Sequence, residues 1–514
     1  MSARLIHELL ARAAEREPER AAIVAGSRSM TYAQLDRESN TLAHALRDHG
    51  VARGDRVGIF LDKSPEALVG IYGVLKAGAT YVPLDDQAPA RRLAYIARDA
   101  GIRCLVTSSA RAAEWPRLIA EGAPLQTLVV AGDADVDAAG LTALPWSALA
   151  GYPVDAPAGT ADTDDLAYIL YTSGSTGEPK GVMLSHLNAL AFVDWAAREV
   201  GVGPEDRLSS HAPLHFDLST FDLFAAAWGA AAVVLVPREA SVFPIELTAF
   251  IRDSRITVWY SVPSILTLLV LRGGLESTSL ADLRTVIFAG EVFPGKYLTR
   301  LMELIPHARF YNLFGPTETN VCTWYEVRHG ESLDGGVPIG YPIEGVELIV
   351  ERPDGSPAER GEEGELLVRG PTVMHGYWGD EARTARVLSS GAGGRVYRTG
   401  DLVREDPGGK LVFLGRRDAQ VKTRGYRVEL GEIEAALYSL STVVECAVVA
   451  VPDEAVTNLL KAFVVTSEPV TDAELAGRCR ERLPRYMVPD EFEFREALPK
   501  SSTGKIDRRS LQGS

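Results

Sequence analysis

The sequence predicts an α/β fold: a large N-terminal domain of mostly parallel sheets and helices, followed by a small, mobile α+β C-terminal lid. Short Val, Ile, Leu and Ala runs alternate with amphipathic helical patterns, which is typical of parallel sheets covered by helices. The chain has 514 residues, of which 46% are hydrophobic. This length is greater than that of a domain built around a single hydrophobic core. We therefore expect an N-terminal domain at residues 1–417 and the lid at residues 418–514.

The individual elements follow from local patterns. Short apolar runs predict buried strands in the N-terminal domain at residues 56–61, 166–170, 231–236, 256–262 and 284–289. An amphipathic segment predicts a helix at residues 245–252, and the Ala-, Gly-, Asp- and Pro-rich stretch 132–163 predicts a loop. In the lid, the same signals predict strands at 443–451 and 461–465 and helices at 432–438 and 472–482.

The strand at 166–170 leads into Tyr-Thr-Ser-Gly-Ser-Thr-Gly-Glu-Pro-Lys-Gly at residues 171–181. Glycines let the backbone approach a ligand closely, and hydroxyls, N–H groups and a lysine suit phosphate oxygens. The loop is not a Walker motif, because Pro179 stands where the second glycine is required. A flexible linker is the alternative interpretation of such a composition.

The loop resembles the phosphate loop of the adenylate-forming enzymes, which include acyl-CoA synthetases, luciferases and the adenylation domains of nonribosomal peptide synthetases. Six further segments resemble motifs of that family in the same order along nearly the whole chain: Met30–Leu35, Leu75–Asp85, Asn312–Thr319, Tyr397–Leu402, Gly415–Glu429 and Leu498–Asp507. The resemblance implies activation of a carboxylate with ATP as an acyl-adenylate, with Mg²⁺ as cofactor.

The resemblance also implies roles for single residues. Glu318 is expected to hold Mg²⁺, Thr317 to contact the α-phosphate, and Lys505 to bridge the substrate carboxylate and the α-phosphate. The expected ATP-binding residues are Thr172, Ser173, Gly174, Thr176, Lys180, Gly290, Glu291, Asn312, Phe314, Asp401 and Arg416. The alternative is that Glu318 and Asp401 are solvated loop acids and that Asn312 is a turn residue.

The acyl pocket is expected to take an α-amino acid, because Asp217 matches the position that holds a substrate ammonium in amino-acid-activating members. The other matched positions are mostly apolar: Phe216, Leu218, Phe221, Tyr260, Ile287, Ala289, Leu313, Val321 and Cys322. As a set they resemble the pocket residues of stand-alone proline-activating ligases. Phe221 departs from that set, in which leucine is commoner, and Ile287 differs in the branching of its side chain. L-Proline is the expected substrate. The alternatives are a D-alanine carrier-protein ligase, an acyl-CoA synthetase, and a binding protein of this fold without activity.

The expected acyl acceptor is the phosphopantetheine thiol of a separate holo peptidyl carrier protein, because no carrier segment follows the last motif. Asp418 is expected to be the hinge of the lid and Gly425 to line the path of the thiol. Lys422, Arg424 and Arg427 beside the hinge are candidates for a local basic docking patch, and the alternative is that they serve nucleotide binding or the fold.

Charge and composition exclude some classes of partner. A net charge of −16 argues against a nucleic acid bound by a broad basic face. The longest apolar stretch, residues 225–236, is too short to cross a membrane, and the start of the chain lacks a signal-peptide pattern. The four cysteines have no metal-ligand spacing, which fits a reducing compartment, so a cytoplasmic location is expected.

Overall fold

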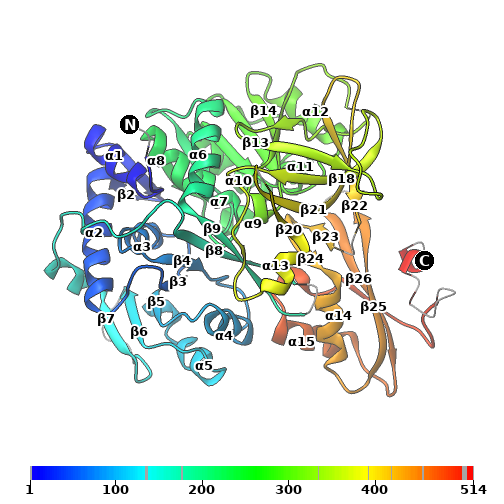
Figure 1. The fold of residues 1–514 in the computed structure, drawn as a ribbon, viewed down its shortest axis with the longest axis horizontal. Coiled ribbons are helices and arrows are strands. Elements are labelled where there is room, and N and C mark those ends of the chain that lie inside the picture. The colour runs from blue at the N-terminus through cyan, green and yellow to red at the C-terminus, as the bar shows by residue number, and fades with distance from the viewer. Residues whose placement is uncertain are drawn as a thin grey trace.

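The computed structural model describes residues 3–132, 137–174, 177–333, 335–391, 393–417, 420–453, 456–500, 506 and 508–512. Two large sheets lie in the N-terminal part, an antiparallel sheet follows them in the chain, and two small sheets lie in the C-terminal part (Figure 1). The predicted α/β class is confirmed, because the inner strands of both large sheets pair in parallel.

The first large sheet carries the phosphate loop. Its antiparallel pair β8 and β9 flanks that loop, with Thr172 opposite Lys180. The order across the sheet is β19 (Gly376–Tyr377), β9 (Lys180–Ser185), β8 (Leu166–Thr172), β4 (Thr80–Pro83), β3 (Arg56–Phe60), β5 (Cys104–Ser108), β6 (Thr127–Ala131) and β7 (Thr142–Pro145).

The second large sheet supplies the loops on the other side of the site. Ligands of α/β sheets bind outside the carboxyl ends of parallel strands, and here β12, β13 and β14 end beside one another. The order is β16 (Tyr341–Pro342), β15 (Thr323–Val327), β14 (Arg309–Phe314), β13 (Thr285–Ala289), β12 (Val258–Ser261), β10 (Arg207–Ser210), β11 (Ala232–Leu235), β1 (Ala21–Ala25) and β2 (Arg28–Thr31).

The third sheet is wholly antiparallel, which the sequence patterns did not predict. Its strands are β17 (Glu347–Glu351), β18 (Glu363–Arg369), β20 (Leu388–Gly391), β21 (Gly394–Glu405) and β22 (Leu411–Arg416). Strands β21 and β22 place Asp401 directly opposite Arg416.

The helices begin where local capping signals stand. The Ser185 side chain accepts the Asn188 N–H, and the Asn188 side chain accepts the Ser185 N–H, so α6 starts directly after β9. The helices of the N-terminal part are α1 (Glu8–Arg16), α2 (Tyr32–Asp48), α3 (Pro65–Lys76), α4 (Ala90–Asp99), α5 (Trp115–Ala120), α6 (His186–Val200), α7 (Leu218–Thr220), α8 (Ala226–Gly229), α9 (Arg238–Val242), α10 (Pro244–Asp253), α11 (Pro263–Arg272), α12 (Gly295–Leu304) and α13 (Glu381–Val387). A π-helical turn, η3 (Phe221–Ala225), joins α7 to α8, and the short 3₁₀ turns are η1 (Ser109–Arg111), η2 (Trp146–Gly151) and η4 (Thr317–Thr319).

The C-terminal part is a small α+β unit with its own apolar core. The elements are β23 (Gln420–Thr423), β24 (Tyr426–Glu429), α14 (Leu430–Tyr438), β25 (Val443–Asp453), β26 (Thr457–Thr466), α15 (Asp472–Arg482), η5 (Arg485–Met487), β27 (Glu491–Phe494) and α16 (Arg508–Gln512). The hairpin of β23 and β24 faces the large sheets, and the longer strands β25 and β26 lie on the outer side (Figure 1).

One predicted element was wrong in part. The stretch 132–163 was expected to be a loop, but it contains β7 and η2. Strand β7 pairs in parallel with β6 at the edge of the sheet, where a proline such as Pro145 is tolerated. Leu144 and Leu149 are buried, and this packing outweighs the turn-rich composition.

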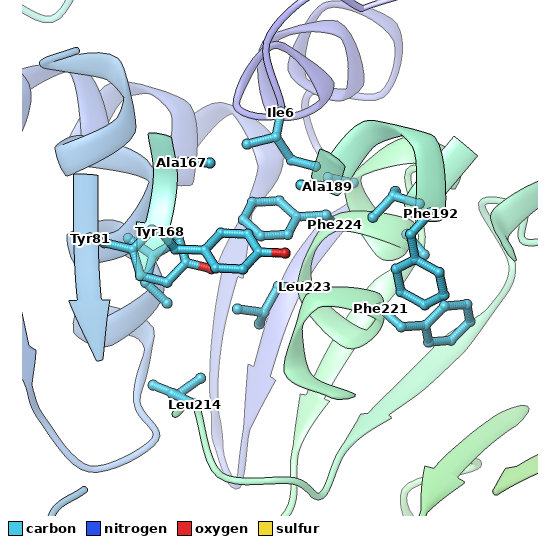
Figure 2. Close-up of a cluster of buried hydrophobic side chains, with 14 of the residues drawn as sticks. Ile6, Tyr81, Ala167, Tyr168, Ala189, Phe192, Leu214, Phe221, Leu223 and Phe224 are labelled. Atoms are coloured by element: carbon cyan, nitrogen blue, oxygen red, sulfur yellow. The ribbon is translucent and has the colours of Figure 1, made fainter. Parts of the chain in front are cut away.

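Aromatic side chains from elements far apart in the sequence pack beneath the site. Figure 2 shows Tyr168 of β8 and Tyr81 of β4 near Phe224 of η3, with Phe192 of α6 beside Phe221. The Tyr81 and Tyr168 ring centroids are 5.2 Å apart. This core joins the first large sheet to the segment that carries Asp217. No helix within the described ranges combines the length and apolar character that a membrane crossing requires.

Candidate active site

The phosphate loop lies between β8 and β9 and contacts the C-terminal part of the chain. The Ser173 hydroxyl donates to the Arg427 carbonyl at 2.8 Å, and the Gly174 N–H donates to the Glu432 carboxylate at 3.2 Å. A Cβ at Gly174 would lie 2.1 Å from the Glu178 carbonyl oxygen, so the turn requires glycine. The predicted Thr176 lies outside the described residues.

The Thr172 hydroxyl is a candidate partner for a phosphate oxygen. Its Oγ1 is buried and has no hydrogen-bond partner among the residues that the structure describes. A buried hydroxyl without a partner is costly, and a phosphate oxygen would satisfy it.

Glu318, on η4 after β14, is fully buried among cationic and hydroxyl donors. Lys180 Nζ lies 3.1 Å and the Tyr377 hydroxyl 2.7 Å from its Oε1, and Arg427 Nη1 lies 2.6 Å from its Oε2. Burial alone raises the pKa of a carboxyl, but here Arg427 and Lys180 hold the pKa of Glu318 well below its usual range. The side chain is therefore an anion placed to meet a cation.

The pairing of Glu318 with Tyr377 and Arg427 was not predicted from the sequence. Tyr377 lies on β19 and Arg427 on β24, each far along the chain from η4. Arg427 stands in a predicted motif, as a candidate for surface docking or, alternatively, for a role in nucleotide binding or in the fold. Its side chain is 14% exposed and engages Glu318, and burial lowers the pKa of Lys422. The Arg424 side chain is 34% exposed, which is more than that of Arg427.

The predicted ribose and adenine residues lie near one another on the second and third sheets. Asp401 accepts from Arg416 Nη1 at 2.5 Å, and burial raises the pKa of Asp401 against the pull of Arg416. Phe314 ends β14, with its ring 5.7 Å from that of Phe413. Asn312 donates to the Pro338 carbonyl at 2.8 Å, which fixes the orientation of its amide.

Gly290 and Glu291 follow β13 and face the C-terminal part of the chain. The Gly425 N–H donates to Glu291 Oε1 at 2.6 Å, and the Ser264 N–H donates to Glu291 Oε2 at 3.0 Å. Both carboxylate oxygens of Glu291 are thus used by backbone donors in this structure. A direct contact of Glu291 with ATP stays a prediction.

A pocket of about 80 Å³ lies at the carboxyl ends of β12 and β13. Asp217 and Thr317 stand at its polar side, where the Thr317 hydroxyl donates to Asp217 Oδ2 at 2.8 Å. Burial raises the pKa of Asp217, and the Thr317 hydrogen bond opposes that shift. Six of the ten predicted substrate residues line the pocket: Phe216, Asp217, Leu218, Tyr260, Ala289 and Val321.

The other four predicted substrate residues, Phe221, Ile287, Leu313 and Cys322, are buried and do not line this pocket. Phe221, for example, packs edge-on against Tyr260 with ring centroids 5.6 Å apart. The direct contact of these four residues with a substrate stays a prediction. Sequence matching cannot separate the two cases, because both kinds of position are apolar.

A second, larger cavity of about 840 Å³ adjoins the small pocket and was not predicted. The two share His215, Phe216, Leu218 and Tyr426 as lining residues. Arg111, Arg238 and Arg424 also line the larger cavity. Asp86 lines the same cavity and pairs with Arg111 at 3.2 Å and with Arg238 at 3.3 Å, so the lining carries both charges.

Gly425 occupies a position that only glycine fits. Its φ is +82°, and a Cβ there would lie 2.5 Å from Val262 Cγ1. It lines the small pocket together with Lys422 and Tyr426 of the same hairpin. The predicted hinge Asp418 and the predicted catalytic Lys505 lie outside the described residues.

Two sequence profiles match the chain: "AMP-binding enzyme" over residues 10–378 and "AMP-binding enzyme C-terminal domain" over residues 432–505. The chain is 40% identical over 513 residues to an L-proline–[L-prolyl-carrier protein] ligase of Pseudomonas fluorescens, covering 99% of each chain. It is 41% identical over 500 residues to a protein of the same name from Streptomyces coelicolor, covering 95% of this chain and 92% of that one.

Among solved structures, the Vibrio cholerae adenylation domain AlmE, in complex with glycyl-adenosine-5′-phosphate, has a TM-score of 0.86. The identity is 25%, and the match covers 100% of this chain and 98% of that one. The agreement in sequence and fold extends over the phosphate loop, the second large sheet and the C-terminal unit alike. The chain therefore belongs to the family of AMP-binding enzymes.

Proposed function

We propose that the chain activates L-proline with ATP as prolyl-AMP and then transfers the prolyl group to the phosphopantetheine thiol of a separate carrier protein. The observation that carries the proposal is a small pocket with one carboxylate, Asp217, at its polar side and apolar walls elsewhere. A buried ammonium needs such a partner, whereas a short apolar side chain needs none. The names of the two curated relatives support the same substrate and acceptor.

In the first half-reaction the proline carboxylate attacks the α-phosphorus of ATP, and pyrophosphate leaves. We assign the triphosphate to Thr172, Ser173, the loop N–H groups and Lys180, and the ribose to Asp401 with Arg416. Positioning and neutralisation of charge are the main contributions of a protein to such a transfer. Lys505 would balance the negative charge that develops at the α-phosphate.

Mg²⁺ fits the residues at Glu318. A buried, ionised carboxylate is the oxygen ligand that this hard cation prefers, and Glu318 is held in that state. When bound, the ion would neutralise charge on the leaving pyrophosphate. The protein's own contribution is to keep Glu318 ionised and oriented, through Lys180 and the Tyr377 hydroxyl.

In the second half-reaction a thiol attacks the acyl carbonyl, and AMP leaves. The larger cavity supports this step, because it adjoins the small pocket and shares Phe216 and Tyr426 with it. We assign the cavity to the phosphopantetheine arm and the arginines of its lining to the phosphodiester. The seating of Gly425 against Glu291 is then the lid pose of the thiol step.

We further propose that residues 418–514 form a lid that rotates about Asp418 between the two half-reactions. Lys500 and Ile506, which flank the segment with Lys505, pair with each other, and α16 packs on β25. The hairpin with Gly425 instead faces the small pocket. A hinge motion would let these two sides of one lid serve different steps.

Substrate-dependent pyrophosphate exchange tests the proposal. Proline should support exchange strongly, and alanine, pipecolate and aryl acids weakly. The reason is that the size of the pocket and the Asp217 carboxylate together determine which substrate is accepted. Radiolabelled proline, ATP and Mg²⁺ would then be offered with either a holo carrier protein or free CoA. Prolyl-CoA formation without transfer to a carrier protein would favour an acyl-CoA synthetase, and preference for D-alanine would favour the D-alanine ligase.

A further inference from the structure

Two charged side chains of the lid contact the protein groups that we assign to the binding of Mg²⁺ and of the phosphates. Arg427 of β24 meets Glu318, the proposed metal ligand, at 2.6 Å. Glu432 of α14 accepts the N–H of Gly174 in the phosphate loop at 3.2 Å. A cation therefore stands at the metal ligand and an anion stands at the phosphate donor.

Both contacts are buried and supported by further partners. The Glu318 side chain is 0% and the Arg427 side chain 14% exposed, so their attraction is weakly screened. Glu432 also pairs with Arg92 of α4, and those side chains are 1% and 7% exposed. The Arg427 carbonyl accepts the Ser173 hydroxyl at 2.8 Å, which adds a second hydrogen bond between the lid and the phosphate loop.

These contacts exclude the ligands that they imitate. Mg²⁺ at Glu318 would add a third cation to a carboxylate that already contacts Arg427 and Lys180, and a phosphate at Gly174 would meet the like charge of Glu432. Conversely, loss of the metal and pyrophosphate without a replacement would leave the buried charge of Glu318 with Lys180 and the Tyr377 hydroxyl at Oε1 but without a cation at Oε2. The lid groups supply that replacement.

We propose that Arg427 and Glu432 form an ionic latch: they replace Mg²⁺ and pyrophosphate at Glu318 and Gly174, so that the present lid pose and magnesium pyrophosphate exclude each other. The proposal rests on the proposed function for the identity of the ligands. It makes release of the first product the event that allows the lid to seat for the thiol step. Arg427 is thus a positioning residue.

The lid pose can be followed directly by energy transfer between two dyes. All four native cysteines are buried, so cysteines introduced at the exposed Ala150 and Ala473 can be labelled selectively. Magnesium pyrophosphate is titrated into the labelled protein without amino acid or carrier protein. Pyrophosphate alone and Mg²⁺ alone serve as separate titrations. The transfer efficiency should change most with the two together.

The latch variants should respond at lower ligand concentration. Arg427→Gln removes the competing cation, so its midpoint should fall by about 5- to 100-fold, because linkage makes the lid pose and the ligand weaken each other equally. Glu432→Gln should shift the midpoint in the same direction. Arg427→Lys keeps the charge and should lie between Arg427→Gln and the unchanged protein.

Arg478→Gln is the matched control within the lid. Arg478 pairs with Glu481 on α15 and donates to the Ser439 hydroxyl, away from Glu318 and the phosphate loop, so the midpoint of this variant should stay unchanged. An unchanged midpoint for both Arg427→Gln and Glu432→Gln, or no response of the unaltered latch to magnesium pyrophosphate, overturns the latch. If the midpoints shift but proline supports no exchange, the latch stands and only the substrate assignment falls.

Discussion

At the scale of single residues, the site separates two kinds of carboxylate. Glu318 is held ionised by Lys180 and Arg427, whereas burial raises the pKa of Asp217 and Asp401. Asp217 therefore gains most from a cationic partner, which a substrate ammonium would supply. The Thr317 hydroxyl holds Asp217 in place until that partner arrives.

Asp217→Asn should lower kcat/KM for proline in pyrophosphate exchange by roughly 100-fold, or about 3 kcal/mol, because the buried ammonium loses its charge partner. The binding of ATP, measured by fluorescence titration, should change little. Exchange that proceeds at a near-normal kcat/KM would show that Asp217 is not the partner of the amino group.

The raised pKa of Asp217 adds a pH dependence. Only the ionised carboxylate pairs with the ammonium, so the KM for proline should rise as the pH falls through this raised pKa, at higher pH than for an exposed aspartate. The same rise should be absent from the Asp217→Asn profile. Identical profiles for both proteins would assign the pH dependence to another group.

Lys505→Ala should depress pyrophosphate exchange by about 100- to 1,000-fold, because Lys505 would stabilise the negative charge that develops at the α-phosphate during adenylation. Thioester formation from supplied prolyl-adenylate should be largely retained. Equal loss in both half-reactions would contradict the assignment of Lys505 to the first step alone.

At the scale of elements, the wall of the small pocket has two layers. Tyr260 of β12 lines the pocket, and Phe221 of the π-helical turn η3 packs behind it. Single-turn π segments occur often at functional sites, since the extra residue re-aims a helix. Here η3 follows directly on α7, which begins after Asp217.

Phe221→Leu should lower the free energy of unfolding by about 1–2 kcal/mol, because a buried ring is removed, as measured by urea denaturation. The preference for proline over alanine should change by less than about tenfold, because the front layer stays in place. Tyr260→Leu, which alters that front layer, should change the preference more. The reverse order of the two effects would show that Phe221 contacts the substrate.

At the scale of the whole molecule, backbone hydrogen bonds and ion pairs join the lid to the N-terminal part. Gly425 donates to Glu291, Ser173 donates to Arg427, and Glu432 pairs with Arg92. Such contacts can be exchanged for ligand contacts at small net cost, which suits a lid that moves.

Gly425→Ala should slow thioester formation at least about tenfold, because its Cβ would meet Val262 and alanine disfavours a positive φ. Pyrophosphate exchange should change much less, since the predicted adenylation pose does not seat this residue there. Val262→Ala in the same protein removes both γ-carbons and should restore part of the rate. Without any such restoration, the close approach to Val262 would not be the cause.

Much of the fold was predictable because the signals were local. Apolar runs predicted β3, β12, β13, β25 and α15 to within a few residues, since periodicity and burial follow from neighbouring side chains. The wholly antiparallel third sheet and β7 were missed. Their strands are short or mixed in composition, and their pairing depends on partners elsewhere in the chain.

The sequence by itself determined the α/β class, the place of the phosphate loop, and the candidate residues Asp217, Glu318 and Asp401, because each motif keeps its chemistry within a short stretch. The tertiary structure alone decided that Tyr377 and Arg427 surround Glu318, that Glu432 reaches Gly174, and that Phe221 lies behind the pocket wall. Charge partners and packing layers come from segments far apart in the chain, and only folding brings them within the few ångströms over which they act.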